Sequence, residues 1–358
     1  MPPARLSDFG IRIGELPPGP LNKLSDVPGV RVGHCTIDSE RHKTGVTIIS
    51  PGPADLFTHK PAAGCCVLNG FGKTTGLVQL EELGTLETPI ALTNTLNVGR
   101  VHDALVEHML EQAAAAGVNL ISVNPLVAEC NDAYLNDIQS RPVRGEHVRR
   151  AFADLRVDFA EGAVGAGAGM SCFQLKGGIG SASRRFALGG QAFTLGALAL
   201  ANFGALRDLR LDGRPVGREL EPVLAAQRQA DQGSVILVLA CDAPLSDRQL
   251  RRVSRRAGVG LARLGSQLGH GSGDIAIAFS TANAPALDEP GEIITLRCVR
   301  EDRLDLLFRA AAESVEEAVL NAMLSAPRTV GFQGRVRESL ADYLPALLGR
   351  PPGAGREQ

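Results

Sequence analysis

The chain has 358 residues, of which 44% are hydrophobic, 21% charged and 4% aromatic, and its formal net charge is -2. This composition is typical of a globular protein and excludes a disordered or fibrous one. The weak net charge and the absence of Trp argue against nucleic acid or an anionic membrane as a partner.

The N-terminal residues and the cysteines predict the cellular location of the protein. Residues 1–8 lack the apolar core of a signal peptide, and no stretch approaches about 18 uncharged apolar residues, so we expect no membrane span and a cytoplasmic location. The seven cysteines are scattered and none belongs to a CxxC motif. We therefore expect reduced thiols, no structural metal site and no cofactor.

Short segments rich in β-branched residues, bounded by Pro and Gly, predict that residues 1–60 alternate short strands with turns and that this half of the chain begins as sheet. Between two later predicted strands, apolar residues recur at helical spacing from 98 to 117, with Gly117 as the expected C-cap. Residues 129–137 are mostly polar, and composition slightly favours an exposed loop there. The predicted strands lie at 30–34, 45–49, 65–68, 89–95 and 120–123.

Two glycine-rich stretches, 162–170 and 176–184, precede an apolar strand predicted at 193–203. The glycines fit neither the dinucleotide-binding pattern GxGxxG nor the phosphate-binding pattern GxxxxGK[ST]. Two interpretations are left, namely backbone packed against backbone, or backbone N–H groups exposed to a ligand oxygen. Residues 205–232 are charged and lack strong periodicity, which predicts an exposed connection.

The second half of the chain centres on an apolar run, 235–240, that predicts a strand buried on both faces. Ser246 then begins a capping box, and apolar spacing predicts a helix to about residue 266. We expect one domain over residues 1–358. Further elements are predicted as a strand at 275–279, helices at about 302–325 and 336–347, and a disordered tail at 349–358.

The apolar run follows directly on Ser234, and Gly233 precedes that serine, so an unshielded peptide bond lies next to a hydroxyl. Gly-Ser before a strand is usually no more than a turn. The functional alternative is self-cleavage, in which Ser234 Oγ attacks the Gly233 carbonyl and water cleaves the resulting ester. The α-amine that Ser234 gains has an ordinary pKa of about 7.7 to 8.0, so it can serve as general base for its own hydroxyl.

The usual motifs for other nucleophiles fail. His270, Ser272 and Asp274 suggest a hydrolytic triad, but residues two apart on an extended segment lie about 6 to 7 Å apart, which predicts no hydrogen bonds among them. GxSxG and HExxH are absent from the sequence. A serine that supplies its own base needs no histidine.

Six motifs follow one another between residues 20 and 335. They are Thr93 to Thr95, Val127 to Ile138, Lys176 to Arg184, Ala201 to Gly204, Gly233-Ser234 and Gly271 to Asp274. Together they resemble the L-aminopeptidase/D-amino acid esterase family, which includes the β-peptidyl aminopeptidases. The resemblance implies a self-processing hydrolase of the N-terminal-nucleophile type, whose α/β fold is a four-layer αββα sandwich related to ornithine acetyltransferases.

The resemblance also implies how the enzyme is processed, how it assembles and which substrates it binds. Self-cleavage between residues 233 and 234 gives chains 1–233 and 234–358, which assemble as a homo-oligomer, a tetramer of processed heterodimers. The implied partner is a small peptide, amide or ester with a free amino group.

Each candidate residue receives a role from the same resemblance. Ser234 is the nucleophile, and Asn202 helps to stabilise the tetrahedral oxyanion. Ser272 and Asp274 lie beside the new amine and tune it. Glu129 holds the free amino group of the substrate.

Alternatives stay open at two positions and for the function. Asp274 stands where members known for β-peptides have Glu, so its carboxylate is about one methylene shorter. The family has a tyrosine near the active serine, and either Tyr134 or Asn131 takes that place here. The competing functions are acyl transfer on the same fold, although relatives of that kind use threonine, and an unprocessed binding or scaffold protein.

Overall fold

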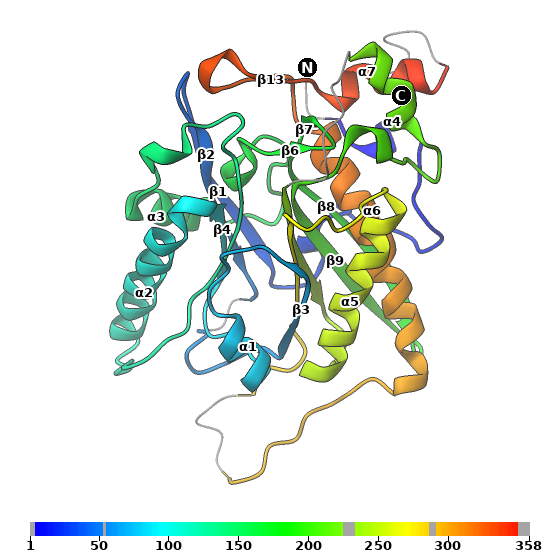
Figure 1. Ribbon diagram of the computed structural model, residues 1–358. Coiled ribbons are helices and arrows are strands. Elements are labelled where there is room, and N and C mark those ends of the chain that lie inside the picture. Colours follow the sequence, from blue (N-terminus) through cyan, green and yellow to red (C-terminus); the bar gives the residue numbers. More distant parts are fainter. Residues whose placement is uncertain (1–3, 53–54, 225–232, 286–290, 350–358) are drawn as a thin grey trace.

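The β-branched segments near the N-terminus pair into a four-stranded sheet. Its strands lie side by side in the order β1 (Arg31–Asp38), β2 (Lys43–Ser50), β4 (Ile90–Asn94) and β5 (Leu126–Cys130). Neighbours are antiparallel except β4 and β5, which are parallel. The computed structural model describes residues 4–52, 55–224, 233–285 and 291–349, and these form a mixed α/β fold (Figure 1).

A five-stranded sheet faces the first one. Its order is β3 (Ala63–Gly70), β11 (Gly273–Ser280), β10 (Ser234–Cys241), β9 (Gln191–Asn202) and β8 (Gly178–Leu188). β10 and β11 are parallel, and the other neighbours are antiparallel. Every residue of β10 is buried, so the prediction of a strand covered on both faces is confirmed.

The unbroken apolar run of β10 has a simple consequence. Successive side chains of a strand point to opposite faces. Ile236 and Val238 therefore join a core shared with Ile90 and Leu92 of the first sheet, between the two sheets. Leu237 belongs instead to the core beneath the helices that cover the outer face.

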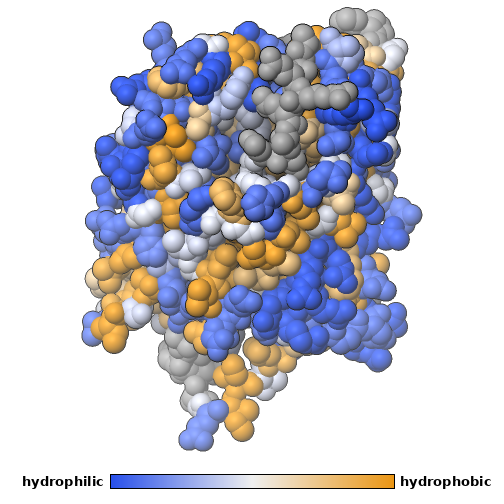
Figure 2. Space-filling view, in the orientation of Figure 1, coloured by the Kyte–Doolittle hydropathy of each residue, from blue (hydrophilic) through white to orange (hydrophobic). Residues whose placement is uncertain are grey.

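Helices cover the outer face of each sheet (Figure 1). α2 (Val98–Ala115) and α3 (Gly145–Ala153) pack on the four-stranded sheet, and α5 (Asp247–Arg263) and α6 (Leu304–Leu324) pack on the five-stranded one. The capping box at Ser246 is confirmed, because its Oγ accepts the N–H of Gln249 at 3.3 Å. The exposed side of α5 carries arginines, and Figure 2 is hydrophilic over that helix.

Smaller elements complete the described chain. Residues 291–300 form an extended arm, at the foot of Figures 1 and 2, on which Ile293 is 90% exposed. None of the helices in the described ranges combines the length and apolar character needed to span a bilayer. The remaining helices are α1 (Leu77–Leu83), α4 (Val216–Val223) and α7 (Leu340–Leu347), and the short strands are β6 (Ser171–Cys172), β7 (Leu175–Lys176), β12 (Thr329–Val330) and β13 (Val336–Arg337).

Two predicted elements are wrong in the first two thirds of the chain. No strand forms at 120–123, where Ile121 is 89% exposed, and the strand lies at 126–130, where every residue is buried. The connection at 205–232 is not wholly exposed, because α4 buries Val216 and Leu220, four residues apart on one helical face. Residues 225–232 lie outside the described residues.

The last predicted helix, 336–347, starts too early. Residues 336–337 pair with β12 as a short strand, and the helix starts at Leu340. The reason is that Ser339 is the N-cap, with its Oγ accepting the N–H of Ala341 at 3.3 Å. Residues 350–358 of the predicted tail lie outside the described residues.

Candidate active site

The predicted nucleophile lies where four strand ends of the five-stranded sheet meet. β9 is antiparallel to β10, so its last residue, Asn202, pairs with Ser234, the first residue of β10. β11 is parallel to β10, so its first residue, Gly273, pairs with Ser234 from the other side. Gly70, at the end of β3, pairs in turn with Gly273. Chain segments far apart in sequence thus surround one serine.

Ser234 is 4% exposed, and its hydroxyl is tied to the peptide bond before it. Ser234 Oγ donates to the Gly233 carbonyl oxygen at 2.6 Å. The Gly273 N–H donates to Ser234 Oγ at 3.1 Å and to the same Gly233 oxygen at 3.3 Å. One backbone donor therefore holds the hydroxyl and the carbonyl together.

Gly233 satisfies two constraints that a larger residue cannot meet. Its φ is +148°, in the region that favours glycine. A Cβ at this position would lie 1.9 Å from the Asn202 carbonyl oxygen. The Gly-Ser pair is thus more than a surface turn, because β9 packs directly against it.

Asn202 is 6% exposed, and two hydrogen bonds orient its side-chain amide. Its Oδ1 accepts the Ser171 N–H at 2.8 Å, and its Nδ2 donates to the Asn131 carbonyl at 3.0 Å. An amide nitrogen carries two hydrogens, and the described residues take up one of them. The amide that carries the second N–H belongs to the residue that pairs with Ser234 across the strands.

Ser272 and Asp274 are both buried, and Ser272 Oγ donates to Asp274 Oδ1 at 2.6 Å. The prediction that residues two apart here make no hydrogen bond is wrong. The segment is not extended, because the Ser272 N–H donates to the Gly269 carbonyl in a turn at 2.9 Å and the strand begins only at Gly273. His270 lies elsewhere, with its ring 6.5 Å from that of Phe71.

Asn69 is a supporting residue that sequence reasoning missed. Its Nδ2 donates to the carbonyls of Gly269 at 3.0 Å, His270 at 3.2 Å and Ser272. One amide thus holds the turn that leads into Asp274. The signal was an Asn at the end of a predicted strand, but only the pairing of β3 with β11 shows what it binds.

Glu129 lies at the end of β5 in the opposite sheet and is 2% exposed. The expectation of an exposed loop fails at this position, because β5 continues through Cys130. Glu129 Oε1 accepts the Lys73 N–H at 3.1 Å, and Oε2 accepts from the Thr95 hydroxyl. The ion pairs among the described residues do not include Glu129, so no cationic side chain of those residues neutralises this buried carboxylate.

A thiol joins the two halves of the site. Cys130 Sγ donates to the Ser234 carbonyl oxygen at 3.3 Å, across the space between the sheets. Because Cys130 follows Glu129 in β5, the contact places the strand that carries the carboxylate against the strand that carries the serine. The two charges of the predicted reaction, an ammonium and an oxyanion, would develop near these neighbouring strand ends.

Asn131 and Tyr134 differ in their surroundings. Asn131 accepts the Asn202 amide through its carbonyl, and its Oδ1 accepts the Ala133 N–H at 3.0 Å. Tyr134 is 37% exposed, and its ring lies 3.5 Å from the Arg337 guanidinium carbon. The structure therefore connects Asn131 to the site through Asn202, and it connects Tyr134 to β13.

The glycine-rich segments pack backbone against backbone. A Cβ on Gly167 would lie 2.6 Å from the Ile179 nitrogen. The buried Lys176 ammonium donates to the carbonyls of Gly167 at 3.0 Å, Met170 at 3.1 Å and Gly177 at 2.7 Å, and burial lowers the pKa of Lys176 to about 7. These contacts favour the packing interpretation over the ligand-binding one.

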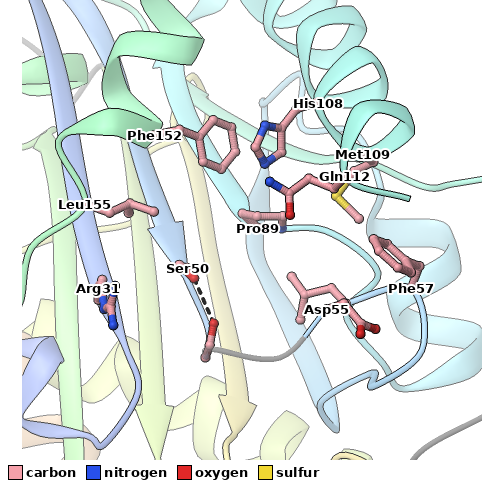
Figure 3. Close-up of a pocket in the computed structure, with 12 residues that line it drawn as sticks. Arg31, Ser50, Asp55, Phe57, Pro89, His108, Met109, Gln112, Phe152 and Leu155 are labelled. Atoms are coloured by element: carbon pink, nitrogen blue, oxygen red, sulfur yellow. Dashed lines mark hydrogen bonds between the residues drawn. The ribbon is translucent and has the colours of Figure 1, made fainter. Parts of the chain in front are cut away.

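Two hollows of the surface lie away from these residues. A cavity of about 370 Å³ opens on the outer side of the four-stranded sheet, where His108 stacks on Phe152 with ring centroids 3.6 Å apart (Figure 3). Its lining contains none of the predicted site residues. A second hollow lies under the arginines of α5, beside Cys66. No cluster of potential metal ligands occurs in the described residues.

Comparisons with known proteins show which family the chain resembles over most of its length. A model of peptidase family S58 matches residues 22–337. The β-peptidyl aminopeptidase BapA of Sphingosinicella microcystinivorans is 38% identical over 353 residues, which cover 92% of this chain and 88% of that protein. A Burkholderia sp. β-aminopeptidase structure is 43% identical, with a TM-score of 0.89 over 97% of this chain and 100% of that one.

A third relative carries information on the fold. The L-aminopeptidase D-Ala-esterase/amidase of Ochrobactrum anthropi is 35% identical, with a TM-score of 0.88 over 97% of this chain and 99% of that one. Its structure is described as a prototype for the serine aminopeptidases and as a new variant of the Ntn hydrolase fold.

Proposed function

This chain belongs to peptidase family S58 and is a hydrolase of peptide bonds, a serine aminopeptidase or amidase of the N-terminal-nucleophile type, and we propose which of its residues perform that chemistry. The alternative of acyl transfer is not favoured, because the named relatives are aminopeptidases. Its substrates are peptides or related amides.

The first proposed step is self-cleavage. Ser234 Oγ attacks the Gly233 carbonyl carbon, the C–N bond breaks, and the Ser234 nitrogen takes up the hydroxyl proton. Water then hydrolyses the ester, which leaves the Gly233 carboxylate on chain 1–233 and a free α-amine and hydroxyl on chain 234–358. The hydroxyl and carbonyl that must react are already held together by the Gly273 N–H.

The second proposed step is turnover. The Ser234 α-amine takes the proton from Oγ as the oxygen attacks the substrate carbonyl, and it returns that proton to the leaving amine. Water, deprotonated by the same α-amine, then hydrolyses the acyl-enzyme ester, which releases the N-terminal residue as its carboxylic acid and returns a proton to Ser234 Oγ. Asn202 Nδ2 donates to the oxyanion. The Ser272–Asp274 pair lies beside the amine and stabilises its protonated form. Glu129 accepts the substrate's ammonium group, which places the N-terminal residue for removal.

The finer architecture and assembly are also proposals. We propose a four-layer αββα sandwich, supported by α2 and α3 on one outer face, α5 and α6 on the other, and an apolar core between the sheets. A homo-oligomer is supported by the exposed apolar side chains of the arm at 291–300. A cytoplasmic location is supported by cysteines that do not pair as disulfides.

The observation that carries the mechanism is the 2.6 Å contact between Ser234 Oγ and the Gly233 oxygen. Its test is denaturing electrophoresis of the wild type and of Ser234→Ala. At the mean residue mass that 37.6 kDa over 358 residues implies, the wild type should give bands of about 24 and 13 kDa. Ser234→Ala should give one intact, inactive chain, because it lacks Oγ.

Ser234→Cys supplies the matched variant. A thiol supports the same acyl shift, so this chain should still be cleaved, at a lower rate. Peptidase activity in Ser234→Ala would eliminate Ser234 as the nucleophile. An uncut but active wild type would eliminate self-cleavage and leave the S58 assignment standing.

A further inference from the structure

Arg337, on β13, is half-buried and has no acidic partner in the described residues. Its recorded hydrogen bond is from Nε to Ser171 Oγ at 3.1 Å. Two other arginines that are at least partly buried differ, since Arg5 lies 3.1 Å from Glu161 and Arg184 lies 2.7 Å from Glu317. A guanidinium removed from water without an anion carries a desolvation cost that a bound anion would offset.

The Arg337 guanidinium stacks on an aromatic ring, and a second cation lies near the same ring. The Arg337 guanidinium carbon lies 3.5 Å from the Tyr134 ring centroid, and that of Arg335 lies 5.7 Å from the same ring. Arg335 donates to the Ala133 carbonyl at 3.2 Å and to Gln333 Oε1 at 2.9 Å, both of which are uncharged. Two positive charges thus lie around one tyrosine, and no carboxylate of the described residues pairs with either.

A short chain of hydrogen bonds connects Arg337 to the reacting centre. Arg337 Nε binds the Ser171 hydroxyl, and the Ser171 N–H binds Asn202 Oδ1 at 2.8 Å. Asn202 faces Ser234 across the strands. The guanidinium is therefore two hydrogen bonds from the proposed oxyanion donor. Its separation from Asn202 Oδ1 is limited to roughly 10 Å by ordinary bond lengths and hydrogen-bond distances.

The substrate's ends differ in charge and in where they can lie. The ammonium is assigned to Glu129 in the opposite sheet, so the leaving part of the peptide extends away from it. In a dipeptide, the carboxylate of the leaving residue lies about 5 Å from the scissile carbonyl carbon by standard backbone dimensions. That length is compatible with an oxyanion at Asn202 and a carboxylate at Arg337.

We propose that Arg337, stacked on Tyr134 and assisted by Arg335, binds the terminal carboxylate of the leaving residue, so that the enzyme prefers very short peptides with a free C-terminus. The inference rests on the proposed function of Ser234 and Asn202. It gives Tyr134 the task of orienting a guanidinium. A planar fork with its face on an aromatic ring presents its edge to a carboxylate.

The test compares the dipeptide Ala-Ala with its C-terminal amide, Ala-Ala-NH₂, which differs in charge at one end. The wild type should show a kcat/KM on the order of 10-fold to 100-fold higher for the carboxylate form, because a charge-assisted hydrogen bond contributes a free energy that corresponds to a factor of this size. Arg337→Gln should reduce this ratio toward one, mainly through KM. Arg337→Lys, which keeps the charge but lacks the fork, should fall in between.

Arg328→Gln is the matched control, because Arg328 precedes the same β12–β13 hairpin and is 3.1 Å from Glu338. It should leave the ratio unchanged. A wild type that cleaves both dipeptides equally would overturn the proposal, as would an Arg337→Gln ratio equal to that of the wild type. A general folding defect lowers both rates in parallel and leaves the ratio at its wild-type value. Failure of the wild type to cleave either compound would instead refute the proposed function.

Discussion

At the scale of single residues, a backbone N–H is as important to the site as the side chain it serves. The Gly273 N–H binds both Ser234 Oγ and the Gly233 oxygen. In the proposed self-cleavage that carbonyl would become the first oxyanion as Ser234 attacks, so the same donor would stabilise its charge. Position 273 has to be small, since a Cβ there would lie 2.9 Å from the Phe71 oxygen.

Asn202 can be tested as an oxyanion donor separately from its structural contact. Asn202→Ala should lower kcat by about 10² to 10³, the usual effect of removing one such donor. Asn202→Asp keeps an acceptor for the Ser171 N–H but removes the donor, so it should lose a similar factor. Steady-state kinetics measure the kcat of both variants, and melting temperatures check that they fold. Full activity in Asn202→Asp would reassign the residue to strand-end packing.

Glu129 is expected to discriminate for a free amino group. Acetylating the substrate amine removes its charge, so kcat/KM should fall roughly 30-fold to 1000-fold, which corresponds to about 2 to 4 kcal/mol. Glu129→Gln should narrow the gap between the two substrates. The measurement uses an aminoacyl p-nitroanilide and its N-acetyl counterpart. Equal wild-type rates on both would refute the role of Glu129.

Asp132 predicts how stability responds to pH. Burial raises the pKa of Asp132 to about 6 from an ordinary 3.8, although the amides of Asn94 and Asn136 donate to it. The folded chain therefore binds this proton more tightly, and the contribution to stability is lost as pH rises from about 4 through 6. Urea denaturation at about pH 4 and pH 6 should show that the free energy of unfolding of Asp132→Asn rises relative to that of the wild type as the pH increases. The same difference in unfolding free energy at both pH values would contradict this prediction.

At the scale of elements, local sequence patterns predicted individual elements better than they predicted contacts between residues far apart in the sequence. The apolar run after Ser234 and the capping box at Ser246 are local patterns, and both were confirmed. Asn69 and Ser171 act on residues about 200 and 31 positions away, and no local pattern indicates such contacts. The Ser272–Asp274 contact was missed because a turn was read as an extended segment.

The motifs behind the family resemblance illustrate the same limit. They contain Glu129, Asn202, Ser234 and Asp274, which the fold gathers at neighbouring strand ends. The spacing of these motifs in the sequence does not predict that the four residues lie close together in the fold. Their proximity arises from the order of the strands, which depends on contacts across the whole chain.

The packing of α6 on β8 gives a prediction about an element. A Cβ on Gly180 would lie 2.1 Å from the Ala318 carbonyl oxygen and 2.2 Å from the Ala322 nitrogen. Gly180→Ala should therefore push helix from strand and cost about 3 kcal/mol or prevent folding. Gly99→Ala, in a helix with nothing within 4 Å of the added atom, is the control. Chemical denaturation that ranks the two variants equally would contradict the account.

At the scale of the whole molecule, a buried charge network ties the N-terminal segment to the last long helix. Arg184 on β8 binds Glu313 at 3.2 Å and Glu317 at 2.7 Å, and also donates to the Ile13 carbonyl at 2.7 Å. Removing one partner of such a buried network leaves charges uncompensated, at a cost of about 3 to 5 kcal/mol. Every residue of α6 from Ala310 to Leu324 is buried, so both carboxylates of the network lie in the interior.

The order of strands in the five-stranded sheet has a consequence for the two chains that the proposed self-cleavage would produce. β10 and β11, from chain 234–358, lie between β3 and β9, from chain 1–233. The two products therefore share one sheet and should elute together in native gel filtration, although they separate in denaturant. A native species of about 13 kDa, which is the mass of chain 234–358 alone, would contradict this expectation.

The same interleaving changes the molecularity of folding. An uncut chain finds its native state as a first-order reaction, whereas the two products must meet, so their refolding is second-order and slows on dilution. The refolding rate of the uncut Ser234→Ala chain should be independent of concentration, and that of the wild type should not. One hydrolysed bond would thus make the stability of the fold depend on the concentration of the protein.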